Sequence, residues 1–116
     1  MIAMITAKFY KKTSNGSIHM ALKGHADVAP KGEDLICASA TMLAYTVAQA
    51  VQFMYENGKL TKKPKINIKD GEAIVIATPT EDAYAEVLHT FWVAQCGIHV
   101  LAHNYPGHVR LEHLTV

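Results

Sequence analysis

The sequence predicts an α+β fold, a single domain in which one sheet carries two helices. Several short segments alternate apolar and polar residues as half-buried strands do, and two longer segments have the composition or periodicity of helices. The elements follow the order ββαββαβ, and no linker, low-complexity tract or convincing repeat interrupts the 116 residues. Half of the residues are hydrophobic and 18% are charged, so residues 1–116 should form one compact domain.

The first three elements are two strands and a long helix. Strands are expected at Met1–Tyr10 and Ser17–Lys23, joined by a hairpin turn at 14–16, where Asn and Gly tolerate positive φ. A helix is expected from Asp34 to Glu56, because this stretch has no Gly or Pro before Asn57-Gly58. The helix is apolar around most of its circumference, which predicts burial on more than one side or a place in a subunit interface.

The remaining elements are a second hairpin, a second helix and a short last strand. Asp70-Gly71 is the strongest hairpin signal in the chain and separates expected strands at Pro64–Lys69 and Ala73–Pro79. The second helix should span about 80–104, and a strand should follow at His108–Leu114.

The second helix should bury one face and expose the other. The face expected against the sheet follows the spacing of helical turns and consists of Tyr84, Val87, Phe91, Ala94, Ile98, Leu101 and Tyr105. The opposite side should carry His89, Trp92, Cys96, His99, Val100 and His103. Cys96, His99 and His103 have a spacing that can present three ligands to Zn²⁺, but no zinc motif supports such a site. A solvated or subunit-facing surface is the better interpretation, with a homo-oligomer contact at Trp92 and Val100 as its functional form, and no metal or other cofactor is expected.

Composition sets limits on location and partners. Lys and Arg exceed Asp and Glu by only one, 11 against 10, which provides no broad cationic surface, so direct binding of nucleic acid is not expected. No 18 apolar residues run together and no signal-peptide pattern is present, so a cytoplasmic protein without a membrane span is expected. In a reducing compartment Cys37 and Cys96 should be thiols rather than a disulfide.

The segment from Gly24 to Ala38 carries the candidate chemistry. It places His25 at the end of a strand and Cys37 in the first turn of a long helix, with an intervening loop at 26–33 that is either mobile or ordered. Helix N–H groups and the positive end of the helix dipole stabilise a thiolate and lower the thiol pKa, and a nearby imidazole supplies the base. In the alternative interpretation Cys37 is a small buried helix residue and His25 a turn residue.

The neighbours of this pair have both structural and catalytic interpretations. Gly24 either keeps the backbone beside His25 open to a substrate or is an ordinary turn glycine. Asp34 either caps the helix by accepting the N–H of Cys37 or orients the imidazole. The backbone N–H groups of Cys37 and Ala38 are candidate oxyanion donors, although a cap at Asp34 would use the first of them.

These residues resemble the ribosomal-processing cysteine protease (Prp) family, whose pattern is a Gly-His-Ala turn and then a cysteine that opens a long helix. The chain carries Gly24-His25-Ala26 and Gly32-Glu33-Asp34-Leu35-Ile36-Cys37-Ala38. The resemblance implies Cys37 as the nucleophile, His25 as the general base and Asp34 as an acidic residue near the site. Thr41 stands where the family often has Ser. The resemblance also implies a dimeric cytoplasmic endopeptidase that removes a short N-terminal extension from a large-subunit bacterial ribosomal protein, cutting after an aromatic residue.

Two other function classes remain open. A thiol redox-sensing protein would also use an activated Cys37, with Cys96 as the available resolving thiol. A non-catalytic ribosome-assembly factor would need no reactive thiol. The apolar surface expected on the two helices favours a homodimer, in which each protomer holds its own His25 and Cys37.

Overall fold

The computed structural model describes residues 4–25 and 34–113. Within these residues the predicted α+β class and the order ββαββαβ are confirmed. The elements are β1 (Ile5–Lys12), β2 (Ser17–Lys23), α1 (Leu35–Glu56), β3 (Lys65–Lys69), β4 (Glu72–Ala77), α2 (Tyr84–Asn104) and β5 (Val109–Glu112).

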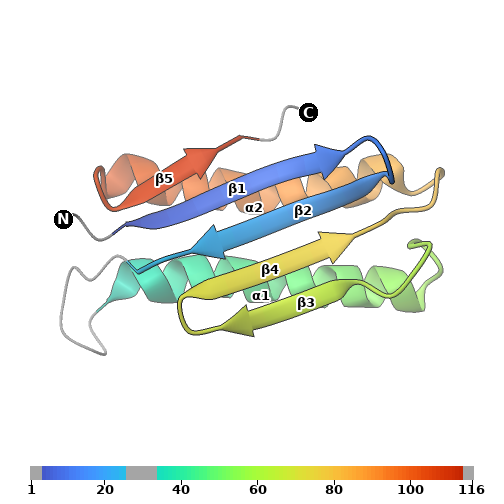
Figure 1. Cartoon of the computed structure of the whole chain (residues 1–116), viewed down its shortest axis with the longest axis horizontal. Helices are drawn as coiled ribbons and strands as arrows, with labels where there is room; N and C mark the ends of the chain where they lie inside the picture. The colour runs from blue at the N-terminus through green and yellow to red at the C-terminus, as the bar shows by residue number, and fades with distance from the viewer. Residues whose placement is uncertain (1–3, 26–33, 114–116) are drawn as a thin grey trace.

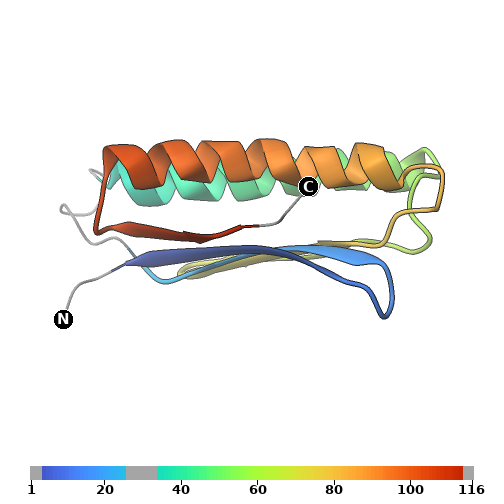
Figure 2. The ribbon, with the colours of Figure 1, turned by 90° about the horizontal axis from the view of Figure 1, so that it is seen from above.

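The five strands form one sheet in the order β3-β4-β2-β1-β5 (Figure 1). Neighbouring strands are antiparallel except β5, which runs parallel to β1 at one edge. Both helices lie side by side on the same face of the sheet, which gives a fold of two layers (Figure 2). Within the described residues the other face of the sheet has no covering element, as antiparallel sheets allow.

Several element boundaries differ from the predicted ones. β1 continues to Lys12, two residues beyond the predicted end, while residues 1–3 lie outside the described part. β4 ends at Ala77, and Pro79 forms only an isolated bridge with Leu60. α2 begins at Tyr84 rather than at Thr80, because residues 80–83 form a turn that precedes the helix.

The core lies between the inner sheet face and the two helices. Alternate strand residues such as Phe9, Met20 and Val75 are fully buried there, and Val87, Phe91, Ala94, Ile98 and Leu101 of α2 are buried as predicted. The prediction that Tyr105 belongs to this buried face is wrong, because Tyr105 follows the last helical residue and is 39% exposed. The six residues predicted for the opposite side of α2 are all exposed.

α1 is buried on two sides, by the sheet and by α2, and exposed on the third. Close approach of the two helices occurs at Gly97, where a Cβ would lie 2.8 Å from the side chain of Leu43. The exposed side of α1 includes Met42 and Phe53, which are 62% and 56% exposed. By length and composition α1 would also be apolar enough to cross a membrane, with a mean hydropathy of 1.3, but core helices share these properties.

Candidate active site

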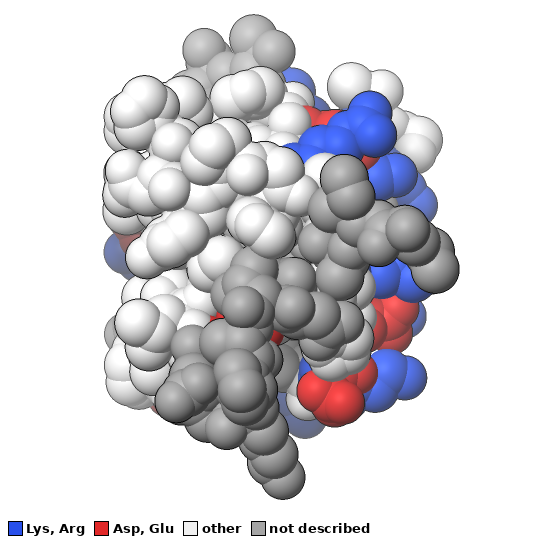
Figure 3. Space-filling view, turned by 90° about the vertical axis from the view of Figure 1, so that its left-hand side faces the viewer, with Lys and Arg blue, Asp and Glu red and all other residues white. Residues whose placement is uncertain are grey.

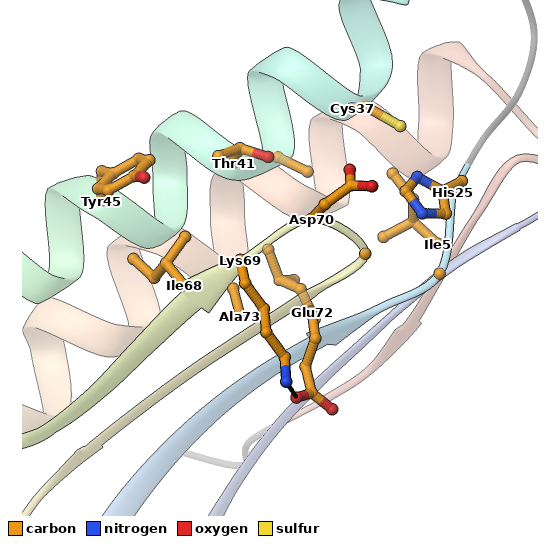
Figure 4. A pocket seen from close by; sticks show the side chains of 14 residues that line it. Ile5, His25, Cys37, Thr41, Tyr45, Ile68, Lys69, Asp70, Glu72 and Ala73 are labelled. Carbon is orange, nitrogen blue, oxygen red and sulfur yellow. Dashed lines mark ion pairs between the residues drawn. The ribbon is translucent and has the colours of Figure 1, made fainter.

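A pocket of about 250 Å³ opens where β2 ends, α1 begins and the β3–β4 hairpin turns (Figure 4). His25 and Cys37 both line it, so the pair that the sequence singles out is brought to one cavity from two different elements. Gly24 and Thr41, also singled out, line the same pocket. The loop at 26–33, expected over or beside the site, lies outside the described residues.

Asp34 fixes the start of α1 as its N-cap. Its Oδ1 accepts the backbone N–H of Cys37 at 3.0 Å, which is the capping alternative that the sequence left open. The N–H of Ala38 donates to the Asp34 carbonyl at 3.2 Å, and the Ala38 side chain lines a hollow between the helices instead of the pocket. Both expected oxyanion donors are therefore already hydrogen-bonded within the helix start.

Two glycines allow the close packing around His25. Gly24 has φ +101°, and a Cβ there would collide with the carbonyl oxygen of Met4. Its N–H donates to the Gly71 carbonyl at 2.9 Å, which ties β2 to the β3–β4 turn. Gly71 has φ +78°, and a Cβ there would lie only 2.8 Å from Nε2 of His25. The turn therefore lies directly against the imidazole, and both positions favour glycine.

The hairpin turn also places carboxylates at the pocket. Asp70 and Glu72 both line it, and Glu72 forms an ion pair with Lys69 at 3.6 Å. The Asp70 carboxylate lies on the side of the pocket where the side chains of His25 and Cys37 are drawn (Figure 4). In the sequence Asp70 indicates only a turn, because its proximity to His25 follows from the pairing of β2 with β4, which no local pattern reveals.

The rest of the pocket lining combines hydroxyl-bearing and apolar side chains. Thr41 and Tyr45 follow Cys37 by one and two turns of α1, so the three side chains share a face of the helix. The apolar part of the lining consists of Ile5, Leu22, Ala40, Ile68 and Ala73. Such a combination can hold an apolar side chain beside a reactive sulfur.

The second cysteine is remote from this chemistry. Cys96 lies exposed on α2 and Cys37 is half-buried in the pocket, and no disulfide joins these two cysteines. Within residues 4–25 and 34–113 no three side chains of His, Cys, Asp or Glu are grouped as metal ligands would be.

Comparison with known proteins assigns the chain to a family. Residues 4–110 match the family described as cysteine protease Prp. The chain belongs to the cysteine protease Prp family. None of the curated proteins is a significant sequence match to it.

Solved structures share the fold over nearly the whole chain. One is the essential ribosomal processing protease Prp from S. aureus in complex with a covalently linked product peptide, with a TM-score of 0.71 and 21% identity. It is covered completely, and 97% of this chain is matched. SMU.848 from Streptococcus mutans matches with a TM-score of 0.67 and 24% identity, over 97% of this chain and 95% of its own. These similarities support the same two-layer fold.

Proposed function

We propose that this member of the family is a cytoplasmic, homodimeric cysteine endopeptidase. Its substrate would be a large-subunit bacterial ribosomal protein, from which it removes a short N-terminal extension by cutting after an aromatic residue. The observation that carries the proposal is the meeting of His25 and Cys37 in one pocket of a cysteine protease family member. The S. aureus relative, whose structures contain a substrate peptide or a covalently linked product peptide, supports the peptide as partner.

In this proposal the reaction proceeds through a thioester. His25 takes the proton of the Cys37 thiol, and the sulfur attacks the carbonyl carbon of the scissile peptide bond. When the tetrahedral intermediate collapses, the C–N bond breaks and the imidazolium returns its proton to the leaving amine. Water, deprotonated by His25, then attacks the thioester, which releases the carboxylate product and restores the thiol.

The two aspartates have different roles in this proposal. Asp34 is committed to the helix start, because its carboxylate accepts the Cys37 N–H at 3.0 Å. It holds the nucleophile in position rather than the imidazole. Asp70 orients His25 and stabilises the imidazolium, since it lines the same pocket and makes none of the ion pairs found within residues 4–25 and 34–113.

The oxyanion needs other donors, because the N–H groups of Cys37 and Ala38 already donate to Asp34. Thr41 offers a hydroxyl one turn after Cys37, at the position where the family often has Ser, and lines the pocket. We assign it the role of a donor to the peptide carbonyl or to the developing oxyanion. The apolar wall formed by Leu22, Ile68 and neighbouring residues would receive the aromatic side chain that precedes the cut.

The helix layer provides the surface for the homodimer. Trp92, Val93 and Val100 of α2 are 43%, 63% and 54% exposed, and Leu35 and Met42 of α1 are exposed beside a hollow between the helices. Because neither helix contains Lys or Arg, a second copy can cover this surface without burying a cation.

A cleavage assay with matched cysteine variants tests the proposed function. The substrate is the ribosomal protein with its N-terminal extension, and the products are identified by mass spectrometry. Cys37→Ala and His25→Ala should each abolish cleavage while the circular dichroism spectrum stays unchanged, because either change disables the same covalent step. Cys96→Ala, the matched control, should keep wild-type turnover. Turnover retained by purified Cys37→Ala would rule the peptidase out and favour a non-catalytic role.

A further inference from the structure

Charge is divided between the two layers of the fold. Among the described residues, Lys and Arg lie in the strands and in the connections between elements, and α1 and α2 contain none. Figure 3 shows the division from one end, where Lys and Arg gather on the sheet side and the helix side is almost free of charge. The net charge of +1 therefore averages two surfaces of different character.

The positive charge converges at a hollow of about 240 Å³, lined by residues at the end of β1, the start of β2 and the start of β3. These strand ends lie at the opposite end of the sheet from the start of α1 (Figure 1). The lining of the hollow consists of Lys12, Asn15, Ser17, His19, Lys62, Lys63, Lys65, Ile76 and Thr78. No described carboxylate is part of this lining. The ion pairs found among the described residues involve Lys8, Lys59 and Lys69, so the four lysines of the hollow share none of them. Four unneutralised ammonium groups around one hollow favour an anion there.

The floor of the hollow is a buried polar pair on the otherwise open sheet face. Ser17 and His19 are only 2% and 5% exposed. The Ser17 N–H and hydroxyl both donate to Oδ1 of Asn15, at 3.0 and 2.6 Å. The Ser17 hydroxyl therefore accepts from Nε2 of His19, which lies 2.7 Å away. Burial and the nearby charge of Lys12 lower the pKa of His19 from 6.5.

An aromatic ring stands beside the hollow. Tyr10 stacks on His19 with ring centroids 4.5 Å apart and planes inclined by 16°, and it remains 40% exposed. The strand register places Tyr10, His19, Ile76 and Lys65 in one row across four strands. The exposed Tyr10 ring therefore lies within a few strand spacings of the lysine-lined hollow.

We infer that this end of the sheet binds single-stranded nucleic acid, with a phosphate group among Lys12, Lys62, Lys63 and Lys65 and a base stacked on Tyr10. A positive groove beside an exposed aromatic ring is the general arrangement by which proteins hold single strands. An acidic peptide would use the lysines but would leave Tyr10 without a base to stack on. The site lies apart from His25 and Cys37, so it does not depend on the proposed peptidase activity.

Fluorescence anisotropy with a labelled oligouridylate RNA tests the inference. Wild-type protein should bind saturably at low salt, and Lys12→Gln/Lys65→Gln should weaken binding by about tenfold or more. The salt slope of the double variant should be smaller by about 0.7 for each phosphate that it no longer neutralises. Lys59→Gln is the control, because it also removes a lysine charge but from a residue paired with Glu86. It should leave the affinity close to wild type.

Three further readouts separate the outcomes. Tyr10→Leu should weaken RNA binding without changing the salt slope, since it removes stacking and no charge. In NMR titrations RNA should raise the pKa of His19, because a bound phosphate stabilises the imidazolium facing Lys12. Peptide cleavage should be equal in all these variants. Absence of saturable binding, equal weakening in Lys59→Gln, or tighter binding of heparin or of anionic lipid vesicles than of RNA would overturn the inference.

Discussion

At the scale of single residues, the proposed mechanism gives two aspartates different roles. Asp34 accepts a hydrogen bond from the backbone N–H of Cys37, and Asp70, in the β3–β4 turn, lines the pocket that contains Cys37. A capping carboxylate acts mainly on stability, whereas an orienting carboxylate acts on the rate of the chemical step. The two roles are separable because asparagine also caps helices well.

Substitution of the two aspartates should therefore give opposite results. Asp34→Asn should keep both stability and most of the activity, and Asp34→Ala should lower the free energy of unfolding by about 1 kcal/mol through loss of the cap. Asp70→Asn should lower kcat with little change in KM or in the urea midpoint, because it removes the charge that orients and stabilises the imidazolium. Steady-state kinetics measures kcat and KM of these variants, and urea unfolding measures their stability. A stable Asp70→Asn variant with wild-type kcat would remove Asp70 from the mechanism.

At the scale of elements, the β3–β4 turn is the part that brings the site together. It lies against the His25 ring at Gly71 and is tied to β2 through the Gly24 N–H. The hairpin was predictable from Asp70-Gly71, and the spacing of Asp34 and Cys37 allowed the cap as one of two interpretations. Their meeting was not predictable, because the pairing of β2 with β4 joins residues about fifty positions apart and depends on the packed sheet.

Two turn glycines provide a matched test of the packing between the turn and His25. Gly71→Ala and Gly16→Ala both place an alanine at positive φ in a hairpin turn, with φ +78° and +73°, so both should lose stability by about 1 kcal/mol. A Cβ at Gly16 has open space around it, but one at Gly71 lies 2.8 Å from Nε2 of His25. Only Gly71→Ala should therefore reduce kcat of the folded enzyme. Equal kcat in the two variants would show that the turn does not position the imidazole.

At the scale of the whole molecule, the two layers offer different surfaces to different partners. The helix layer is apolar and without cations, the outer sheet face is basic, and the pocket lies at one end between them. Net charge and overall composition could not reveal this separation, because they add the two layers together. The apolar circumference of α1 did predict that the sheet and the neighbouring helix would leave part of its apolar surface exposed.

The exposed apolar surface of the helix layer predicts a homodimer. Light scattering at micromolar concentration should give the mass of a dimer, and Met42→Glu/Val100→Glu should give a monomer, because two carboxylates would be buried without partners. Mixing His25→Ala with Cys37→Ala should restore no cleavage, since both side chains line a pocket of one chain. A monomeric wild-type mass would contradict the dimer, and activity regained on mixing would show a site shared between chains.

If the start of α1 and His25 together activate Cys37, the activation is measured by the rate of alkylation of its thiol. Iodoacetamide labelling of each cysteine in the folded protein is followed by mass spectrometry between about pH 6 and 9. Cys37 should react much faster than Cys96 near neutral pH and should keep its reactivity to lower pH, and His25→Ala should reduce this difference. Equal rates for Cys37 and Cys96 across the range would show that Cys37 is not activated.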